Sequence, residues 1–170
     1  PDDGTDIVRL EIKLSPKCRA PETEDPRIRF FTEEWSEKRL ARWYNTLAAF
    51  VSTSKAEGWG LHVHEAMASG VPVIATKFSG HAEFINESTA FVVPHSLVPA
   101  QGIYQGLGLW GEPDLWSLVD RMRQVADGGA SIRRIADNGC RVAQSYSWDD
   151  TCGRIHEILK EVGVFAPPIP

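Results

Sequence analysis

Residues 52–76 of the chain read STSKAEGWGLHVHEAMASGVPVIAT. The segment begins at the end of a predicted strand and continues through a loop that carries glycine on both sides of Trp59. A helix is predicted over residues 61–69, because Gly70 follows it directly in the position where helices usually end. The next residues, 71–75, are nearly all apolar, which is typical of a strand buried on both faces. This order of strand, loop, helix and buried strand predicts an α/β fold with a parallel sheet.

The sequence on either side of this segment continues the alternation. We expect further strands at residues 7–14, 28–31, 48–52 and 89–93, an amphipathic helix at 37–47, and a turn with a short helix at 79–85. A glycine-rich loop of about 18 residues is expected after Pro94. Three helices follow, the first with Pro113 at its first position and the last opened by a capping box of Ser147 and Asp150. The predicted fold is a Rossmann-like parallel sheet with helices on both faces that ends in a run of helices, in a single domain over residues 1–170.

Composition limits the classes of function. Hydrophobic residues make up 42% of the chain and charged residues 24%, as in ordinary soluble proteins, and the net charge is −5. This balance argues against a large basic surface for nucleic acid or anionic lipid. No apolar run is long enough to span a membrane. The three cysteines, Cys18, Cys140 and Cys152, form no pattern, which favours reduced thiols and a cytoplasmic location.

The loop before the predicted helix has the features of an anion site. A glycine-flanked loop that leads into a helix presents free backbone N–H groups, and the helix dipole adds positive potential there. Glu57 lies in this loop and Glu65 lies about one turn into the helix. Each carboxylate can accept two hydroxyl hydrogen bonds, which matches the vicinal diols of ribose and hexose. A diphosphate between two diols describes a nucleotide sugar; the alternative is that both glutamates are ordinary solvated charges.

The spacing of the two glutamates also resembles a known family. Glu57 and Glu65 are separated by seven residues, which resembles the E-x7-E motif of retaining glycosyltransferases of the GT-B fold, particularly glycosyltransferase family 4. The similarity continues through the turn at residues 78–80 with the acid Glu83, through the strand at 90–93 and through the Tyr-Ser-Trp at 146–148. It covers most of the chain, from about Ile7 to Leu159.

The resemblance implies a role for individual residues. Glu65 would hold the ribose hydroxyls, and Glu57 would contact the donor sugar and act in catalysis. Backbone N–H groups from Gly58 to Leu61 would face the diphosphate and the sugar, and Thr32 lies where the family's base-contacting loop usually runs. The donor-binding residues implied in this way are Thr32, Glu57, Gly58, Trp59, Gly60, Leu61 and Glu65. The implied reaction transfers a glycosyl group from a nucleotide diphosphate sugar to an unknown acceptor, with retained anomeric configuration and without a metal or another cofactor.

Two departures from the family pattern stand out. His62 occupies a position where the family often has proline. The family's first strand and helix of this domain, which carry an arginine and a lysine for the diphosphate, have no counterpart, and neither does the N-terminal acceptor domain. We therefore expect the chain to be part of the C-terminal, donor-binding half of a longer enzyme and to be inactive when isolated. The missing half is its expected partner, and peripheral membrane association through that half stays open.

Other signals favour structural interpretations. His62 and His64 are two residues apart on a helix, so they point to different faces and no metal site is expected. The G-x-G-x-x-G of Gly106, Gly108 and Gly111 lacks the strand and helix of a dinucleotide site and is interpreted as a flexible loop. Trp110 and Trp116 are expected to attach this loop to the core.

Three alternative functions remain open on the sequence. A nucleotide-sugar epimerase shares the two-domain fold, and a phosphorylase or an enzyme of the starch- or sucrose-synthase type shares the motif. A non-catalytic module that only binds nucleotide sugar or a protein partner is the third alternative.

Overall fold

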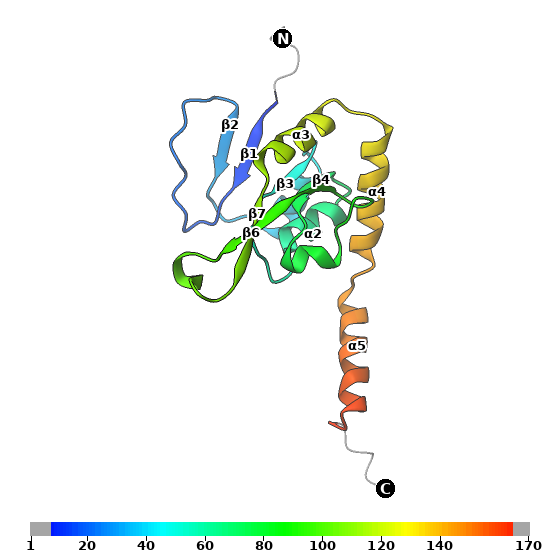
Figure 1. Cartoon of the computed structure of the whole chain (residues 1–170). Coiled ribbons are helices and arrows are strands. Elements are labelled where there is room, and N and C mark those ends of the chain that lie inside the picture. The colour runs from blue at the N-terminus through cyan, green and yellow to red at the C-terminus, as the bar shows by residue number, and fades with distance from the viewer. Residues whose placement is uncertain (1–7, 165–170) are drawn as a thin grey trace. The chain divides into compact units, whose positions relative to one another are not determined.

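The computed structural model describes residues 8–164, which form two compact units. The first unit extends to Leu40 and the second begins at Ala41, so the division falls within helix α1 (Glu37–Tyr44). Figure 1 labels the elements along the chain. Each unit is described by itself below, and the interpretation of residues 1–170 as one domain stays a prediction.

The first unit contains a pair of parallel strands. Strand β1 (Leu10–Lys13) pairs with β2 (Ile28–Phe31), in a register that joins Leu10 to Ile28 and Lys13 to Phe31. Strand β2 has the predicted bounds. Strand β1 is shorter than the predicted 7–14, whose first residue lies outside the described residues.

Helix α1 ends at Tyr44, three residues before the predicted end. The amide Nδ2 of Asn45 donates to the carbonyl of Ala41 at 2.7 Å, and the Thr46 hydroxyl donates to the carbonyl of Trp43 at 2.8 Å. At the same place the backbone N–H groups of Thr46 and Leu47 donate to the carbonyls three residues before them, and this tighter turn ends the α-helix.

The second unit is built on three parallel strands. Strand β4 (Val73–Thr76) lies between β3 (Phe50–Ser52) and β5 (Phe91–Val93), and all four residues of β4 are buried, as the apolar run predicted. Helix α2 (Leu61–Ala68) forms the crossover from β3 to β4. A 3-10 helix, η1 (Ser79–Glu83), follows β4 at the place where a turn and short helix were predicted.

The core of this unit lies on both faces of β4. Ile74 packs with Phe91 and Val93 into a buried cluster. The partly buried side chains around that cluster come from the β3 segment and from the C-terminal helices: Ala49, Val51, Leu118, Val125, Ile132 and Ile135. Because alternate residues of a strand point to opposite faces, Val73 and Ala75 face the other side. Helix α2, which packs against β4, contributes the buried residues Val63, Ala66 and Met67.

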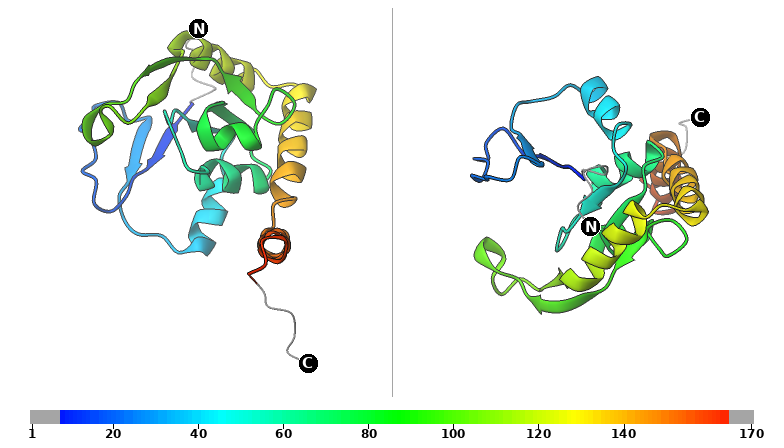
Figure 2. Two further views of the ribbon diagram at one scale, coloured as in Figure 1. Left: turned by 60° about the horizontal axis from the view of Figure 1, so that its bottom comes forward. Right: turned by 90° about the horizontal axis from the view of Figure 1, so that it is seen from above.

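Three helices close the described chain. They are α3 (Leu115–Ala126), α4 (Ala130–Gln144) and α5 (Trp148–Glu161), and α4 lies beside α2 in the views of Figure 2. The close approach of α4 depends on Gly139, where an added Cβ would lie 2.6 Å from the carbonyl oxygen of Thr89. The N-cap of the predicted capping box is confirmed, since Ser147 Oγ accepts a hydrogen bond from the backbone N–H of Asp150 at 3.0 Å, while the Asp150 carboxylate accepts from the Ser147 hydroxyl at 2.6 Å.

The prediction of a long loop after Pro94 was wrong. Strand β6 (His95–Pro99) pairs antiparallel with β7 (Leu109–Pro113), and the 3-10 helix η2 (Gly102–Tyr104) lies at their turn. This β6–β7 hairpin is the green arm in Figures 1 and 2. The glycines suggested a loop, but Gly108 supplies a positive φ at the turn and Gly111 packs inside the ladder.

Two smaller predictions about this region also change. Pro113 ends a strand instead of opening a helix, and Asp114 caps α3 by accepting from the N–H of Ser117 at 2.7 Å. Trp116 is 79% exposed, so it does not attach the segment to the core. Trp110 is half-buried and lies against Tyr104, with ring centroids 6.2 Å apart.

Candidate functional site

The predicted donor site lies at the carboxyl end of β3. We call residues 53–60, which connect β3 to α2, the donor loop. The loop contains Glu57, which is half-buried. It leads directly into α2, whose first residue, Leu61, lies four positions before Glu65. In open α/β sheets ligands bind beyond the carboxyl ends of the strands, which is where this loop is found.

The backbone of Glu57 is fixed by a segment 22 residues further along the chain. Its N–H donates to Ser79 Oγ at 2.8 Å, and the Ser79 hydroxyl donates in turn to the Glu57 carbonyl at 2.9 Å. The N–H of Gly80 donates to the same carbonyl at 3.0 Å. The first residues of η1 therefore fix the backbone of Glu57, the first glutamate of the motif.

Two glycines allow this close packing. At Gly80 an added Cβ would lie 2.5 Å from the Gly58 carbonyl oxygen, so the two backbones touch. At Gly60, which has a φ of +88°, an added Cβ would overlap the ring of His81. Gly60 of the donor loop and Gly80 of η1 thus serve a structural purpose beside any contact with a ligand.

The first turn of α2 offers unpaired N–H groups. Gly60 is the N-cap residue and has no side-chain oxygen, and the intrahelical bonds begin with the N–H of Val63 donating to the Gly60 carbonyl at 3.0 Å. The N–H groups of Leu61 and His62 precede the first bond within the helix. Leu61 is exposed, so this positive end of the helix reaches the surface beside Glu57.

Glu65 is fixed by a tyrosine from the preceding helix. The hydroxyl of Tyr44 donates to Glu65 Oε2 at 3.2 Å, while Glu65 itself is exposed. Burial of the phenol, and then the negative charge of Glu65, raise the pKa of Tyr44 far above its ordinary value. The sequence analysis gave Tyr44 no role in the site; its hydroxyl is the signal that could have indicated a polar partner.

His62 faces the same region. Its Nε2 lies 3.1 Å from Ser52 Oγ and 3.9 Å from Glu57 Oε1. His81, from η1, lies behind it with ring centroids 5.8 Å apart and is buried. Burial lowers the pKa of His81, against the opposing effect of a hydrogen bond between its Nδ1 and the Thr76 carbonyl. The sequence did not indicate these contacts of His62.

His64 points to a different part of the molecule, as the helical spacing predicted. Its ring packs among aromatic rings, with centroid distances of 5.4 to 5.9 Å to Phe84, Tyr146 and Trp59. The Trp59 side chain belongs to this cluster, so only its backbone remains available for the predicted contact with the donor. Within residues 8–164 no group of three or more His, Cys, Asp or Glu side chains is arranged to hold a metal ion.

Thr32 belongs to the first unit. It directly follows β2 and is half-buried. Its contact with the base of a nucleotide stays a prediction.

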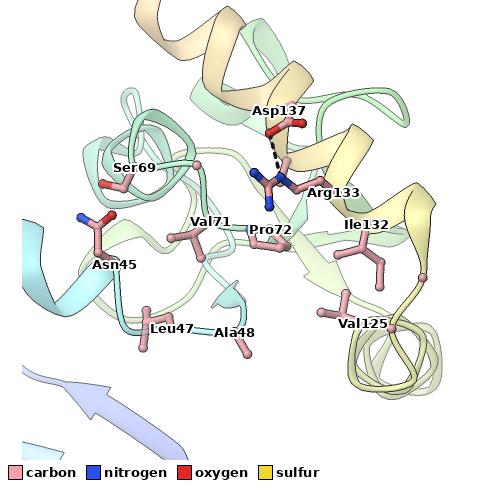
Figure 3. Close-up of a pocket in the computed structure, with 14 residues that line it drawn as sticks. Asn45, Leu47, Ala48, Ser69, Val71, Pro72, Val125, Ile132, Arg133 and Asp137 are labelled. Carbon is pink, nitrogen blue, oxygen red and sulfur yellow. Dashed lines mark ion pairs between the residues drawn. The ribbon is translucent and has the colours of Figure 1, made fainter.

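A separate pocket lies at the opposite end of the strands (Figure 3). It is lined by residues that precede β3 and β4, such as Leu47 and Pro72, and by the ends of α3 and α4. Arg133 and Asp137 of α4 form an ion pair of 3.5 Å at its edge. Because Glu57 follows the carboxyl end of β3, this pocket is distinct from the predicted donor site.

Comparison with solved structures identifies the class of fold. The chain is similar to sucrose-phosphate synthase from Thermosynechococcus elongatus, with a TM-score of 0.62 and 24% identity over 80% of this chain and 30% of that one. It is also similar to the C-terminal domain of a glycosyl transferase group 1 family protein from Francisella tularensis, with a TM-score of 0.55 and 26% identity over 71% of this chain and 54% of the other. The fold is that of the C-terminal half of a GT-B glycosyltransferase, as predicted.

Comparison of sequences identifies the family. Residues 12–104 match the family described as glycosyl transferases group 1, so the chain belongs to this family. It is 25% identical over 122 residues to D-inositol 3-phosphate glycosyltransferase of Streptomyces coelicolor, and 41% identical over 54 residues to the lipopolysaccharide core biosynthesis mannosyltransferase LpsB of Rhizobium meliloti. These matches cover 72% and 30% of this chain, but only 23% and 15% of the relatives. None of the described helices is both long and apolar enough to cross a membrane.

Proposed function

We propose that this chain supplies the donor-binding site of a retaining glycosyltransferase that uses a nucleotide diphosphate sugar. The observations that support the proposal are the hydrogen bonds that hold the two glutamates of the motif: Ser79 holds the backbone of Glu57, in the loop before α2, and Tyr44 holds the carboxylate of Glu65, within α2. The diphosphate would accept hydrogen bonds from the first N–H groups of α2. The Glu65 carboxylate would accept hydrogen bonds from the ribose hydroxyls, and the Glu57 carboxylate would accept them from hydroxyls of the sugar.

This arrangement suits the chemistry of glycosyl transfer. As the bond between sugar and diphosphate breaks, negative charge develops on the leaving phosphate oxygen. The N–H groups and dipole of α2 are already oriented and stabilise that charge without reorganisation. Glu57 holds the sugar with its anomeric carbon open to the acceptor. The groups that bind the acceptor are proposed to lie in the remainder of a longer enzyme.

The proposal is tested by calorimetric titration of the chain with UDP, GDP and ADP, and with their hexose derivatives. Replacing Glu65 by Ala removes two charge-assisted hydrogen bonds and weakens nucleoside diphosphate binding by at most about 1.5–3 kcal/mol for each bond. Glu87→Ala, an exposed carboxylate beyond η1, is the matched control. Equal affinity of the wild type and Glu65→Ala for every nucleotide would contradict the proposal.

A second experiment separates the two glutamates. Glu57→Gln keeps the shape of the side chain and removes its charge. In the full-length enzyme we expect it to lower turnover more than nucleoside diphosphate affinity, because the proposed contact is to the sugar. A retained anomeric configuration in the product, read by NMR, supports the retaining mechanism, and an altered sugar stereocentre without a new glycoside would identify an epimerase.

A further inference from the structure

The ring of His62 lies close to two side chains, the buried Ser52 hydroxyl and the Glu57 carboxylate that is proposed to bind the sugar. One nitrogen, Nε2, is 3.1 Å from Ser52 Oγ, within hydrogen-bond distance, and 3.9 Å from Glu57 Oε1, within ion-pair distance. Ser52 is 5% exposed at the end of β3, so its hydroxyl is a fixed partner for the ring. The Glu57 carboxylate is half-exposed and depends on its neighbours for a defined orientation.

Glu57 lies within ion-pair distance of the ring, and two other rings pack beside it. Phe50 of β3 packs at 5.9 Å between centroids, and His81 of η1 packs at 5.8 Å. His81 is buried, and that burial, together with the positive charge of a protonated His62, lowers the pKa of His81, so its neutral form is favoured. Glu65 belongs to the same helix as His62 and accepts from Tyr44.

The protonation state of the His62 ring determines whether the ring attracts the Glu57 carboxylate. A neutral imidazole can place a hydrogen on only one of its nitrogens, and Nε2 can be satisfied by Ser52 alone. A protonated ring carries a hydrogen on Nε2 under all conditions and has a positive charge that attracts the carboxylate. Histidine is the side chain that changes between these forms near neutral pH.

We propose that His62 is a positioning residue for Glu57: the protonated ring, anchored on Ser52, holds the Glu57 carboxylate in the orientation that receives the donor sugar. This inference rests on the proposed function, which assigns the sugar contact to Glu57. Recognition of the sugar, as distinct from the nucleotide, should therefore depend on the contact between His62 and Glu57 and be stronger at about pH 6 than at about pH 8.

The first test measures how much the sugar adds to affinity. The probes are the nucleoside diphosphate that binds best and its hexose derivative, titrated calorimetrically at about pH 6 and about pH 8, on either side of the ordinary histidine range. In the wild type, the ratio of the two affinities should favour the hexose derivative by about threefold or more at the lower pH, relative to the higher. His62→Gln should give the same ratio at both values. His156→Gln, an exposed histidine on α5, is the control and should behave as the wild type.

The second test needs no donor. Nitrogen NMR of the histidine rings at about pH 6 reports on the environment of each ring nitrogen. Glu57→Gln and Ser52→Ala should each change the Nε2 signal of His62 and leave that of His156 unchanged. The inference would be overturned if the His62 signal is unchanged in Glu57→Gln. It would also be overturned if the affinity ratio depends on pH equally in His62→Gln and in the wild type. If Glu57→Gln leaves the affinity ratio at the wild-type value while the His62 signal responds, the assigned role of Glu57 fails and the contact between the two side chains stands.

Discussion

The hydroxyl of Tyr44 donates a hydrogen bond to the carboxylate of Glu65, and so connects the end of α1 to α2 across 21 positions of the chain. The phenol is 3% exposed, whereas Glu65 is exposed, so the bond extends from the interior to the surface. It restricts the rotamers of the carboxylate that is proposed to bind ribose.

Replacing Tyr44 by Phe should therefore weaken nucleotide binding without disturbing the apolar packing of the ring. The lost bond has a charged acceptor that water can reach, so we expect a cost of about 1 kcal/mol, in affinity for nucleoside diphosphate measured by calorimetry. Tyr146→Phe is the control, because its hydroxyl bonds to the Glu83 carbonyl and not to Glu65. A Tyr44→Phe affinity equal to that of the control would show that Glu65 needs no support.

The hydroxyl of Ser79 makes two bonds to the backbone of Glu57, so its removal should loosen the donor loop. We expect Ser79→Ala to destabilise the fold by about 1–2 kcal/mol, since each bond contributes about 0.5–1.5 kcal/mol. Urea unfolding measures this change, and proteolysis of the folded chain should show faster cleavage between β3 and α2. Ser96→Ala, at an exposed position of β6, should leave both unchanged. If Ser79→Ala is cleaved between β3 and α2 at the same rate as the wild type, the Ser79 hydroxyl does not hold the donor loop.

Gly80 and Gly58 provide a matched pair for the close approach of η1 to the donor loop. Gly80→Ala places a Cβ 2.5 Å from the Gly58 carbonyl oxygen, and a backbone atom cannot move aside without shifting Glu57. We expect a destabilisation of about 1–3 kcal/mol in urea unfolding. At Gly58 an added Cβ meets nothing within 4 Å, so Gly58→Ala should change the free energy of unfolding by less than about 0.5 kcal/mol. If Gly80→Ala and Gly58→Ala change the free energy of unfolding equally, the close approach of Gly80 to the Gly58 carbonyl would be contradicted.

His64 and His81 should make the fold sensitive to acid. Burial lowers the pKa of both rings below the ordinary value of 6.5, and the Nε2 atom of each is buried without a hydrogen-bond partner. The unfolded chain therefore binds protons at a higher pH than the folded chain does. The stability that the neutral rings contribute is complete above about pH 6.5 and is lost as the pH falls below it.

The measurement is the free energy of unfolding in urea between about pH 7.5 and about pH 5.5. We expect it to decrease with falling pH in the wild type. In His64→Phe, whose ring would suit the surrounding Phe84, Tyr146 and Trp59, the decrease should be smaller. His156→Gln on α5 should keep the wild-type dependence. An undiminished dependence in His64→Phe would assign the acid sensitivity to other groups.

Much of the fold was predictable because its signals are local. The apolar run at residues 71–75 and the Gly70 stop define β4 and the end of α2 to within two residues. The β6–β7 hairpin was missed because neither strand has a regular apolar alternation, and its pairing joins residues such as Val98 and Trp110 that only the fold brings together. Helix α1 ends early because the N–H groups of Thr46 and Leu47 donate to carbonyls three residues before them, which no periodicity reveals.

The candidate site was predictable in its residue types but not in its supports. The spacing of Glu57 and Glu65 follows from the motif, and their positions around the α2 N-terminus follow from the helix. Ser79 and Tyr44 support them from two other elements, at separations of 22 and 21 residues, and Ser52 contacts the neighbouring His62 at a separation of 10 residues. Such contacts depend on which strands are neighbours in the sheet, and a single sequence does not specify that.

The β6–β7 hairpin is joined to the donor loop at its base and exposed at its turn. The N–H of Gly111 donates to the Lys55 carbonyl at 2.9 Å, and Lys55 also forms an ion pair with Glu112. The turn residues 101–109 are all exposed. Exposed turns tolerate insertions well, so a fluorophore or a short affinity tag inserted at Gly106 would report on the donor loop through a rigid two-stranded connection. The hairpin thus offers an attachment point for following donor binding without altering any residue of the site.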